Sequence, residues 1–98
     1  MKVVWSPAAL QQLDEAVSHI ARDDPRAAEG WLQRLLEIIA HTTAFPRQGR
    51  MVPEKRRADL RQIQHLPYRI IYRIDAHAIV ILSLRHSRRA PNVTLAED

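Results

Sequence analysis

The first half of the chain carries two apolar stripes with helical spacing. Apolar residues recur at intervals of three and four, which is the pattern of an amphipathic helix. The two stripes comprise Leu10, Leu13, Val17 and Ile20, and then Ala28, Trp31, Leu32, Leu35, Leu36 and Ile39. Ser6-Pro7 and Asp24-Pro25 precede them, each a capping residue followed by proline at the first helical position. Two such helices with so short a break are expected to form an antiparallel hairpin.

The remaining apolar positions form short runs that are typical of strands. Residues 2–5 precede the first helix, and runs at 60–63, 68–74 and 78–84 follow the second. The breaks between the last three runs are short enough for hairpins, so these strands are expected to be antiparallel in sequence order. Residues 79–82 lack polar alternation, which favours a central position in the sheet. The polar stretch 47–57 is predicted to be a connection.

This order of elements, β-α-α-β-β-β, predicts a single α+β domain over residues 1–89, with a loose C-terminal tail at 90–98. The composition is 46% hydrophobic, enough for one core. No apolar run approaches the ~20 residues that a membrane span needs. There is no signal-peptide pattern at the N-terminus. The chain has no cysteine, so disulfides and thiolate metal sites are excluded, and a cytoplasmic location is expected.

Cofactor and metal motifs are absent from the sequence. The only glycines are Gly30 and Gly49, so there is no glycine-rich loop to cradle a phosphate. The five histidines have neither a His-x-x-x-His pair nor a carboxylate at metal-ligand spacing. We therefore expect no cofactor and no metal.

Positive charge is concentrated in the second half of the chain. Lys and Arg number 15 against 11 acidic residues, and all but four of these cations (15 − 4 = 11) lie from Arg47 onward, where Lys55 is the only lysine. Arginine binds phosphate and carboxylate through two parallel hydrogen bonds. This half of the chain therefore suits a polyanion or an acidic partner.

Strand alternation assigns part of this charge to one surface. In the run 68–74, Arg69 and Arg73 alternate with Tyr68, Ile70, Tyr72 and Ile74. A helical hairpin covers one face of a sheet, so the two arginines are expected on the open face. We predict a functional basic face made of Arg61, Arg69, Arg73, His86, Arg88 and Arg89. The alternative is that Arg69 and Arg73 form ordinary ion pairs with Asp59, Glu54 or Asp75.

Aromatic residues have two readings. Tyr68 and Tyr72 could stack on bases, as aromatic side chains do on RNA-binding sheets. Their spacing with Ile70 and Ile74 favours packing in the core instead. The same argument places Trp31 in the core, because it lies on the second apolar stripe.

Four segments, taken in order, resemble one known family. They are Trp5-Ser6-Pro7, Gly49-Arg50-Met51-Val52-Pro53-Glu54, the run from Tyr68 to Asp75, and the run from Ala78 to Arg89. This set resembles the RelE/ParE toxins of bacterial type II toxin–antitoxin systems, from Lys2 to about Arg89. The resemblance implies a twisted antiparallel sheet with a helical hairpin packed on one face.

The family has two branches, and each implies a different site. The RelE branch implies ribosome-dependent mRNA cleavage, with Glu54 as base, His86 as proton donor, and Arg61 and Arg69 on the phosphate. That branch has lysines on the strand corresponding to Asp59–Gln64 and a tyrosine after the last strand, and this chain has neither. The ParE branch is closer and implies a non-enzymatic poison of DNA gyrase, without catalytic residues.

The expected partners follow from these readings. A toxin of this family implies a cognate antitoxin and a toxin–antitoxin hetero-oligomer. The antitoxin is expected to lay a helix beside the hairpin and to add a strand to the sheet edge. The preferred target is DNA gyrase; the alternative target is the ribosome with its mRNA. A third reading, from another class, is a nucleic-acid-binding module without toxicity.

Overall fold

The computed structural model describes residues 1–88. The elements are β1 Lys2–Trp5, α1 Pro7–Asp23, α2 Pro25–Ala44, β2 Arg50–Met51, β3 Leu60–His65, β4 Tyr68–Ile74 and β5 Ala78–His86. Arg89 and the predicted tail at 90–98 lie outside the described residues, and the predicted domain boundary there stays a prediction. No helix among residues 1–88 has the length and apolar character to cross a membrane.

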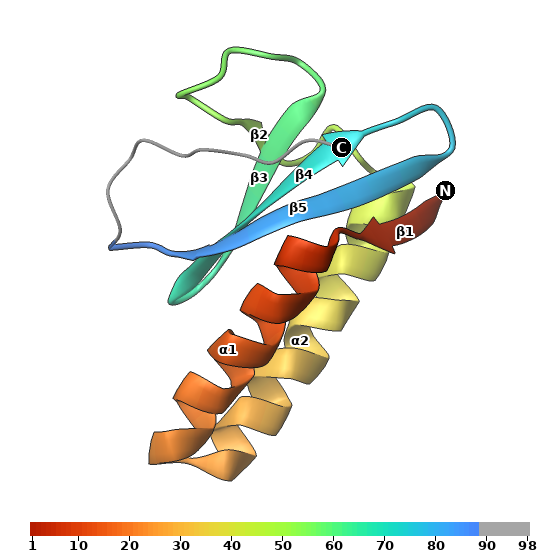
Figure 1. Ribbon diagram of the computed structural model, residues 1–98. Coiled ribbons are helices and arrows are strands. Elements are labelled where there is room, and N and C mark those ends of the chain that lie inside the picture. The colour runs from red at the N-terminus through yellow and green to blue at the C-terminus, as the bar shows by residue number, and fades with distance from the viewer. Residues whose placement is uncertain (89–98) are drawn as a thin grey trace.

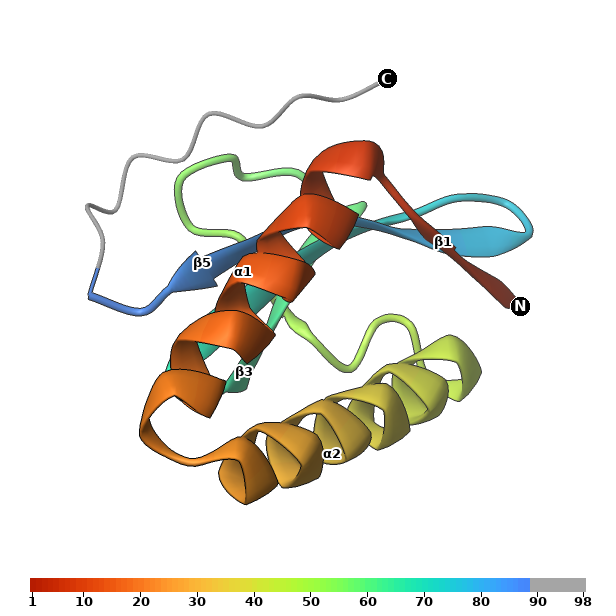
Figure 2. The same ribbon diagram turned by 60° about the horizontal axis from the view of Figure 1, so that its bottom comes forward.

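The strands form one sheet in the order β1-β5-β4-β3-β2. The last four strands of the chain pair antiparallel, whereas β1 pairs parallel with β5. The sheet is therefore mixed at one edge, and not antiparallel throughout as the resemblance implied. The chain between β1 and β5 contains the helical hairpin and the other three strands, which is long enough for parallel pairing. The predicted α+β class and the central position of β5 are confirmed. Figure 1 and Figure 2 show both helices on the same side of the sheet.

Both helices begin where the sequence indicates. The Ser6 hydroxyl accepts a hydrogen bond from the Ala9 amide at 3.0 Å, and it donates to the Leu82 carbonyl at 3.2 Å. The first helix is thereby capped and also attached to β5. The Asp24 carboxylate accepts from the Arg26 amide at 3.0 Å and caps the second helix.

The main core lies between the helices and the sheet. Its buried residues are Ala9, Ala16, Trp31, Leu35, Ile39, Ile70, Tyr72, Ile79, Ile81 and Leu84. Trp31 and Tyr72 are thus core residues as predicted, and Tyr68 packs against the same cluster. Two residues of the predicted apolar stripes are not in the core. Leu10 and Leu36 are 53% and 49% exposed, because they turn away from the sheet.

A second, smaller core lies on the opposite face. The long connection between β2 and β3 folds over this face and buries Val52, Leu60, Ile71 and Leu82. The predicted open face is therefore partly covered. The strand β2 has only two residues and therefore no periodic signal, and it was predicted as part of the polar connection. It forms the edge of the sheet beside β3.

The turn between β3 and β4 is attached to α2. The Trp31 indole N–H donates to the Leu66 carbonyl at 3.0 Å. His65 Nε2 lies 2.9 Å from the Trp31 carbonyl, which can only accept, so this nitrogen donates. The two rings stack with centroids 4.9 Å apart. Tryptophan therefore fixes the far end of the hairpin as well as filling the core.

Candidate binding surfaces

Arginines lie on the sheet face opposite the helices, as alternation predicts. Arg69 pairs across the sheet with Gln64 on one side and Arg85 on the other, and Arg73 pairs with Leu60 and Val80. Paired residues share a face, so Arg85 belongs to this surface too. The prediction missed Arg85, because the register shift between Ile71 and Tyr72 changes the alternation along β5 and a regular strand pattern does not show it.

Arg69 is held between two side chains. Its guanidinium donates to Gln62 Oε1 and to Glu54 Oε2, both at 3.0 Å. The side chains of Arg69 and Glu54 are only 14% and 17% exposed. The hydrogen bond from Arg69 lowers the pKa of the Glu54 carboxyl below its ordinary value. Arg69 therefore attaches the covering connection to the sheet.

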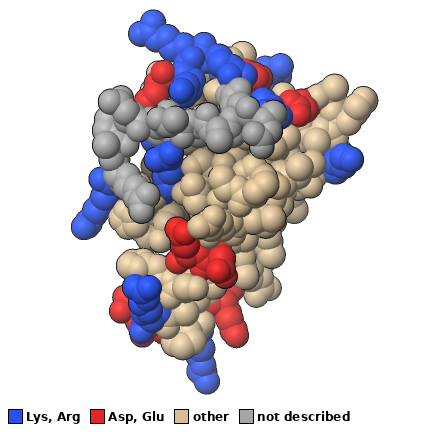
Figure 3. Space-filling model, viewed as in Figure 1, with Lys and Arg blue, Asp and Glu red and all other residues tan. Residues whose placement is uncertain are grey.

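Arg73 is also paired. Its guanidinium donates to both Asp75 oxygens, at 3.0 Å and 3.3 Å, and these bonds lower the pKa of Asp75. Nearby, Arg57 donates to Asp59 and lowers the pKa of that carboxyl in the same way. The ion pairs that formed the alternative reading of Arg69 and Arg73 are thus present. Figure 3 likewise shows acidic side chains among the basic ones.

Arg61 does not belong to the face that carries Arg69. It pairs with Tyr72, whose side chain lies in the helix-side core. Its guanidinium donates to the carbonyls of Ala58 and Gly49, at 2.8 Å and 3.2 Å. The prediction was wrong because Arg61 is two residues from Ile63, which packs toward the helices, and residues two apart share a face.

His86 also lies on the helix side, contrary to the prediction. It pairs with Tyr68, and the two rings meet edge to face with centroids 5.4 Å apart. The Arg88 amide donates to His86 Nδ1 at 3.2 Å. His86 is two residues after Leu84, so both side chains lie on the same face of β5, and Arg85 lies on the opposite face. Arg89, the last member of the predicted basic face, lies outside the described residues.

The four residues of the nuclease reading are therefore not brought together. Glu54 and Arg69 contact each other on the covered face. Arg61 and His86 lie on the other face, at opposite ends of the β3–β4–β5 register. Within residues 1–88, no group of three or more His, Asp or Glu side chains is placed to hold a metal ion.

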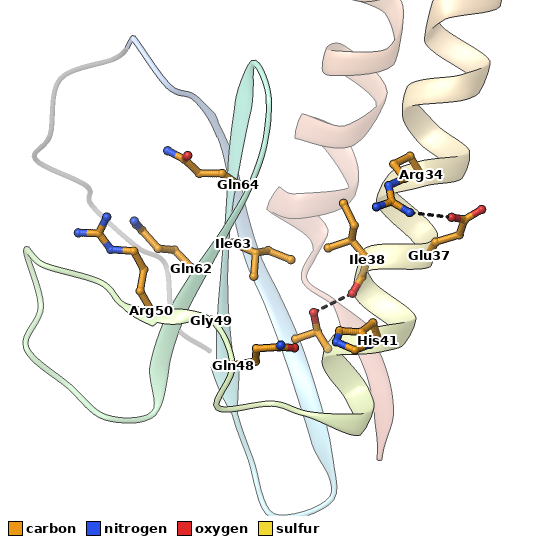
Figure 4. A pocket seen from close by; sticks show the side chains of 11 residues that line it. Arg34, Glu37, Ile38, His41, Gln48, Gly49, Arg50, Gln62, Ile63 and Gln64 are labelled. Atoms are coloured by element: carbon orange, nitrogen blue, oxygen red, sulfur yellow. Dashed lines mark hydrogen bonds and ion pairs between the residues drawn. The ribbon is translucent and has the colours of Figure 1, made fainter.

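A groove of about 750 Å³ separates α2 from the β2–β3 edge. Ile38 and Ile63 project toward one another across it, and the Arg34–Glu37 ion pair lies at its rim (Figure 4). The side chain of Gln64 points away from α2 in this view, so the strand's backbone lines the groove. In the described chain β2 pairs with β3 only at Arg61 and Gln62, which leaves the edge at Gln64 without a neighbouring strand.

A second hollow of about 470 Å³ lies between α1 and the end of β5. Its walls are mainly polar and aromatic, and these residues were not predicted to lie together. The lining residues are Gln12, Glu15, Ala16, His19, Arg22, Tyr68, Leu84, His86 and Arg88. We call this hollow the α1–β5 trough. Its helix residues share one flank at intervals of three and four, a signal that the sequence contained.

Three comparisons relate the chain to known proteins. A family model described as the ParE toxin of the type II toxin–antitoxin system parDE matches residues 3–91. A protein of Sinorhizobium fredii named "Putative toxin Y4kP" is 31% identical over 88 residues, covering 90% of both chains. A solved structure, the chromosomal ParDE system from P. aeruginosa, has a TM-score of 0.70 at 21% identity, over 88% of this chain and 95% of that one.

The match to the family model spans most of the chain, and the S. fredii relative is similar over nearly its full length. The solved structure has the same fold. A toxin of a parDE pair implies a cognate antitoxin as its partner. The chain belongs to the ParE toxin family of type II toxin–antitoxin systems.

Proposed function

We propose that this toxin acts in the cytoplasm as a non-enzymatic poison of DNA gyrase and does not cleave mRNA. The resemblance of its Gly49–Glu54, Tyr68–Arg73 and His86–Arg89 segments to the ParE branch supports this choice. The observation that carries it is the separation of Glu54 from His86 on opposite faces of the sheet. The rival reading needs both at one phosphate.

The chemistry of RNA cleavage explains why this separation matters. A metal-independent nuclease needs one group to take the 2′-hydroxyl proton and another to protonate the leaving oxygen, each within hydrogen-bond reach. Arg69 holds the Glu54 carboxylate and lowers its pKa, which makes it a weaker base. Arginine stays charged at neutral pH and cannot transfer the proton itself. An arginine that is exposed and not engaged within the protein can instead bind a polyanion or an acidic protein surface.

The deciding experiment runs two reactions in parallel with the purified toxin. One contains gyrase, supercoiled plasmid and ATP; the other contains programmed ribosomes with a defined mRNA. We expect linear, protein-linked DNA in the first and intact message in the second. His86→Gln should keep the gyrase effect, whereas a nuclease that used His86 would lose about 10²-fold or more in rate.

If the wild-type toxin cleaves the mRNA and His86→Gln does not, the RelE-like nuclease function replaces gyrase poisoning as the conclusion. A chain that neither arrests growth when expressed alone nor affects either reaction would fit the non-toxic binding module.

We further propose that the antitoxin occupies the groove between α2 and the β2–β3 edge. An extended segment can pair with the backbone at Gln64 and place an apolar side chain between Ile38 and Ile63. Main-chain pairing of this kind supplies affinity, and the pocket beside it supplies specificity.

A matched pair of variants on α2 tests this site. Ile38 is half-buried in the groove, whereas Leu36, two residues away, is exposed outside it. Ile38→Lys should weaken antitoxin binding by about tenfold or more, since buried apolar anchors carry most interface energy. Leu36→Lys should leave binding unchanged in the same calorimetric titration. Equal effects of the two variants would place the antitoxin elsewhere.

A further inference from the structure

The α1–β5 trough carries hydrogen-bond donors whose orientation is fixed. Gln12 Oε1 accepts a hydrogen bond from the Leu84 amide at 2.8 Å. The Nε2 amino group of Gln12 is then the end that can donate to a ligand. His86 Nδ1 accepts the Arg88 amide at 3.2 Å, so a neutral ring carries its proton on Nε2. Two side chains that can donate or accept are thus both set to donate.

The charge of the trough is positive. Arg22 and Arg88 are exposed on its walls, and no carboxylate within residues 1–88 lies within 4.0 Å of either guanidinium. The acidic lining residue is Glu15, whose carboxylate accepts a hydrogen bond from Gln11 at 3.4 Å. Donors and cations together favour a ligand with several oxygen acceptors and negative charge.

Aromatic rings complete the lining. Tyr68 and His86 meet edge to face at one end, and His19 lies on the helix flank. The helix residues from Gln12 to Arg22 span about 15 Å at 1.5 Å per residue. A cationic groove of this length with aromatic walls is the combination that proteins use for single-stranded nucleic acid. An acidic peptide would match the cations but would leave the rings without a role.

We propose that the α1–β5 trough binds the sugar–phosphate backbone of single-stranded nucleic acid. Arg22 and Arg88 contact phosphates, and the rings of His86 and Tyr68 pack against a base or sugar. This binding is a property of the toxin alone and does not depend on the proposed action on gyrase. It can therefore fail while the gyrase proposal stands, and the reverse.

The test is fluorescence anisotropy with the full-length chain and a labelled oligothymidylate of about 12 nucleotides, within the range of known single-strand sites. Each phosphate contact adds about 0.7 to the slope of log K against log salt concentration. Losing one contact should therefore weaken binding about fivefold at ~0.1 M salt. Arg22→Gln and Arg88→Gln should each show this loss and this smaller slope. Arg56→Gln, an equal charge change on the exposed β2–β3 connection, should show neither.

The ring is tested separately by His86→Gln, which keeps a donor and removes the aromatic surface. Binding should weaken about fivefold or more, the range of base–aromatic contacts. Equal losses in Arg22→Gln, Arg88→Gln and Arg56→Gln would overturn the site in favour of diffuse attraction. Duplex DNA or polyglutamate bound more tightly than oligothymidylate would overturn the ligand. Circular dichroism verifies that each variant is folded.

Discussion

Two arginine-bearing regions of this toxin use the same side chain differently. On the face opposite the helices, Arg69 and Arg73 are mostly buried, at 14% and 17% exposed, and each is bonded to a carboxylate. In the α1–β5 trough, Arg22 and Arg88 are exposed, and no described carboxylate is within ion-pair distance. Arg69 and Arg73 are engaged in ion pairs within the protein. Arg22 and Arg88 face solvent in a hollow.

The difference shows why a count of cations does not locate a binding surface. Arg61 makes the same point, since its guanidinium bonds to the backbone carbonyls of Ala58 and Gly49 and thereby shapes the connection before β3. A guanidinium whose donors are engaged and whose surface is covered contributes mainly to folding. Exposure and the absence of a carboxylate are the features that leave an arginine available to a ligand.

Removing one arginine from each region should separate these roles most strongly. Arg69→Met should lower the free energy of unfolding by about 2 kcal/mol, because it leaves a mostly buried carboxylate and the Gln62 amide oxygen without their donor. Arg88→Met should change it by less than about 0.5 kcal/mol, as exposed substitutions usually do. Urea unfolding followed by circular dichroism measures both.

The control for this comparison removes the carboxylate as well. In Arg69→Met with Glu54→Gln, no buried charge remains, so part of the lost stability should return. If Arg69→Met unfolds at the same urea concentration as the wild type, the ion pair contributes nothing to stability, and Arg69 is available to a ligand after all.

The two glycines offer a smaller contrast in stability. A Cβ on Gly49 would meet the Tyr72 hydroxyl and, at 2.9 Å, the Gln62 carbonyl. That hydroxyl is fixed by its 2.6 Å bond to the Pro46 carbonyl. Gly49→Ala should therefore destabilise by about 1–2 kcal/mol through overpacking. Gly30, within α2, has open space around it, so Gly30→Ala should stabilise by about 0.5–1 kcal/mol.

Thermal unfolding of both variants measures this contrast. Similar melting temperatures for Gly49→Ala and the wild type would mean that the Tyr72 side chain can shift at little cost.

The helices and four of the five strands in residues 1–88 could be predicted because their signals are local. The N-caps Ser6 and Asp24, each followed by proline, and the apolar stripes of period 3.6 depend only on residues close in sequence. The parallel pairing of β1 with β5 joins segments more than seventy residues apart, and no short-range pattern encodes it. A two-residue strand such as Arg50–Met51 is too short to show a period.

The sites were harder to predict, for reasons that individual residues illustrate. Alternation placed Arg69 and Arg73 correctly, because both lie on one strand. Relating Arg61 to them required the register between strands, and relating His86 required the bulge between Ile71 and Tyr72, which shifts the pairing with β5. The trough combines a helix flank with a strand end, so only the folded chain brings Arg22 and Arg88 to one hollow.

Acid titration gives the finest test of the contrast between the two regions. Bonding to Arg69 lowers the pKa of Glu54 from its ordinary value of 4.5, so the unfolded chain takes up this proton at a higher pH than the folded chain. The stability that the ion pair contributes is present above pH 4.5 and is lost as the pH falls through the folded-state pKa. The stability difference between wild type and Glu54→Gln should therefore shrink on acidification. The difference between wild type and Arg88→Met should stay flat, because no carboxylate within residues 1–88 is paired with Arg88. A constant difference for Glu54→Gln across this range, measured by urea unfolding at each pH, would show that Glu54 titrates normally in the folded toxin.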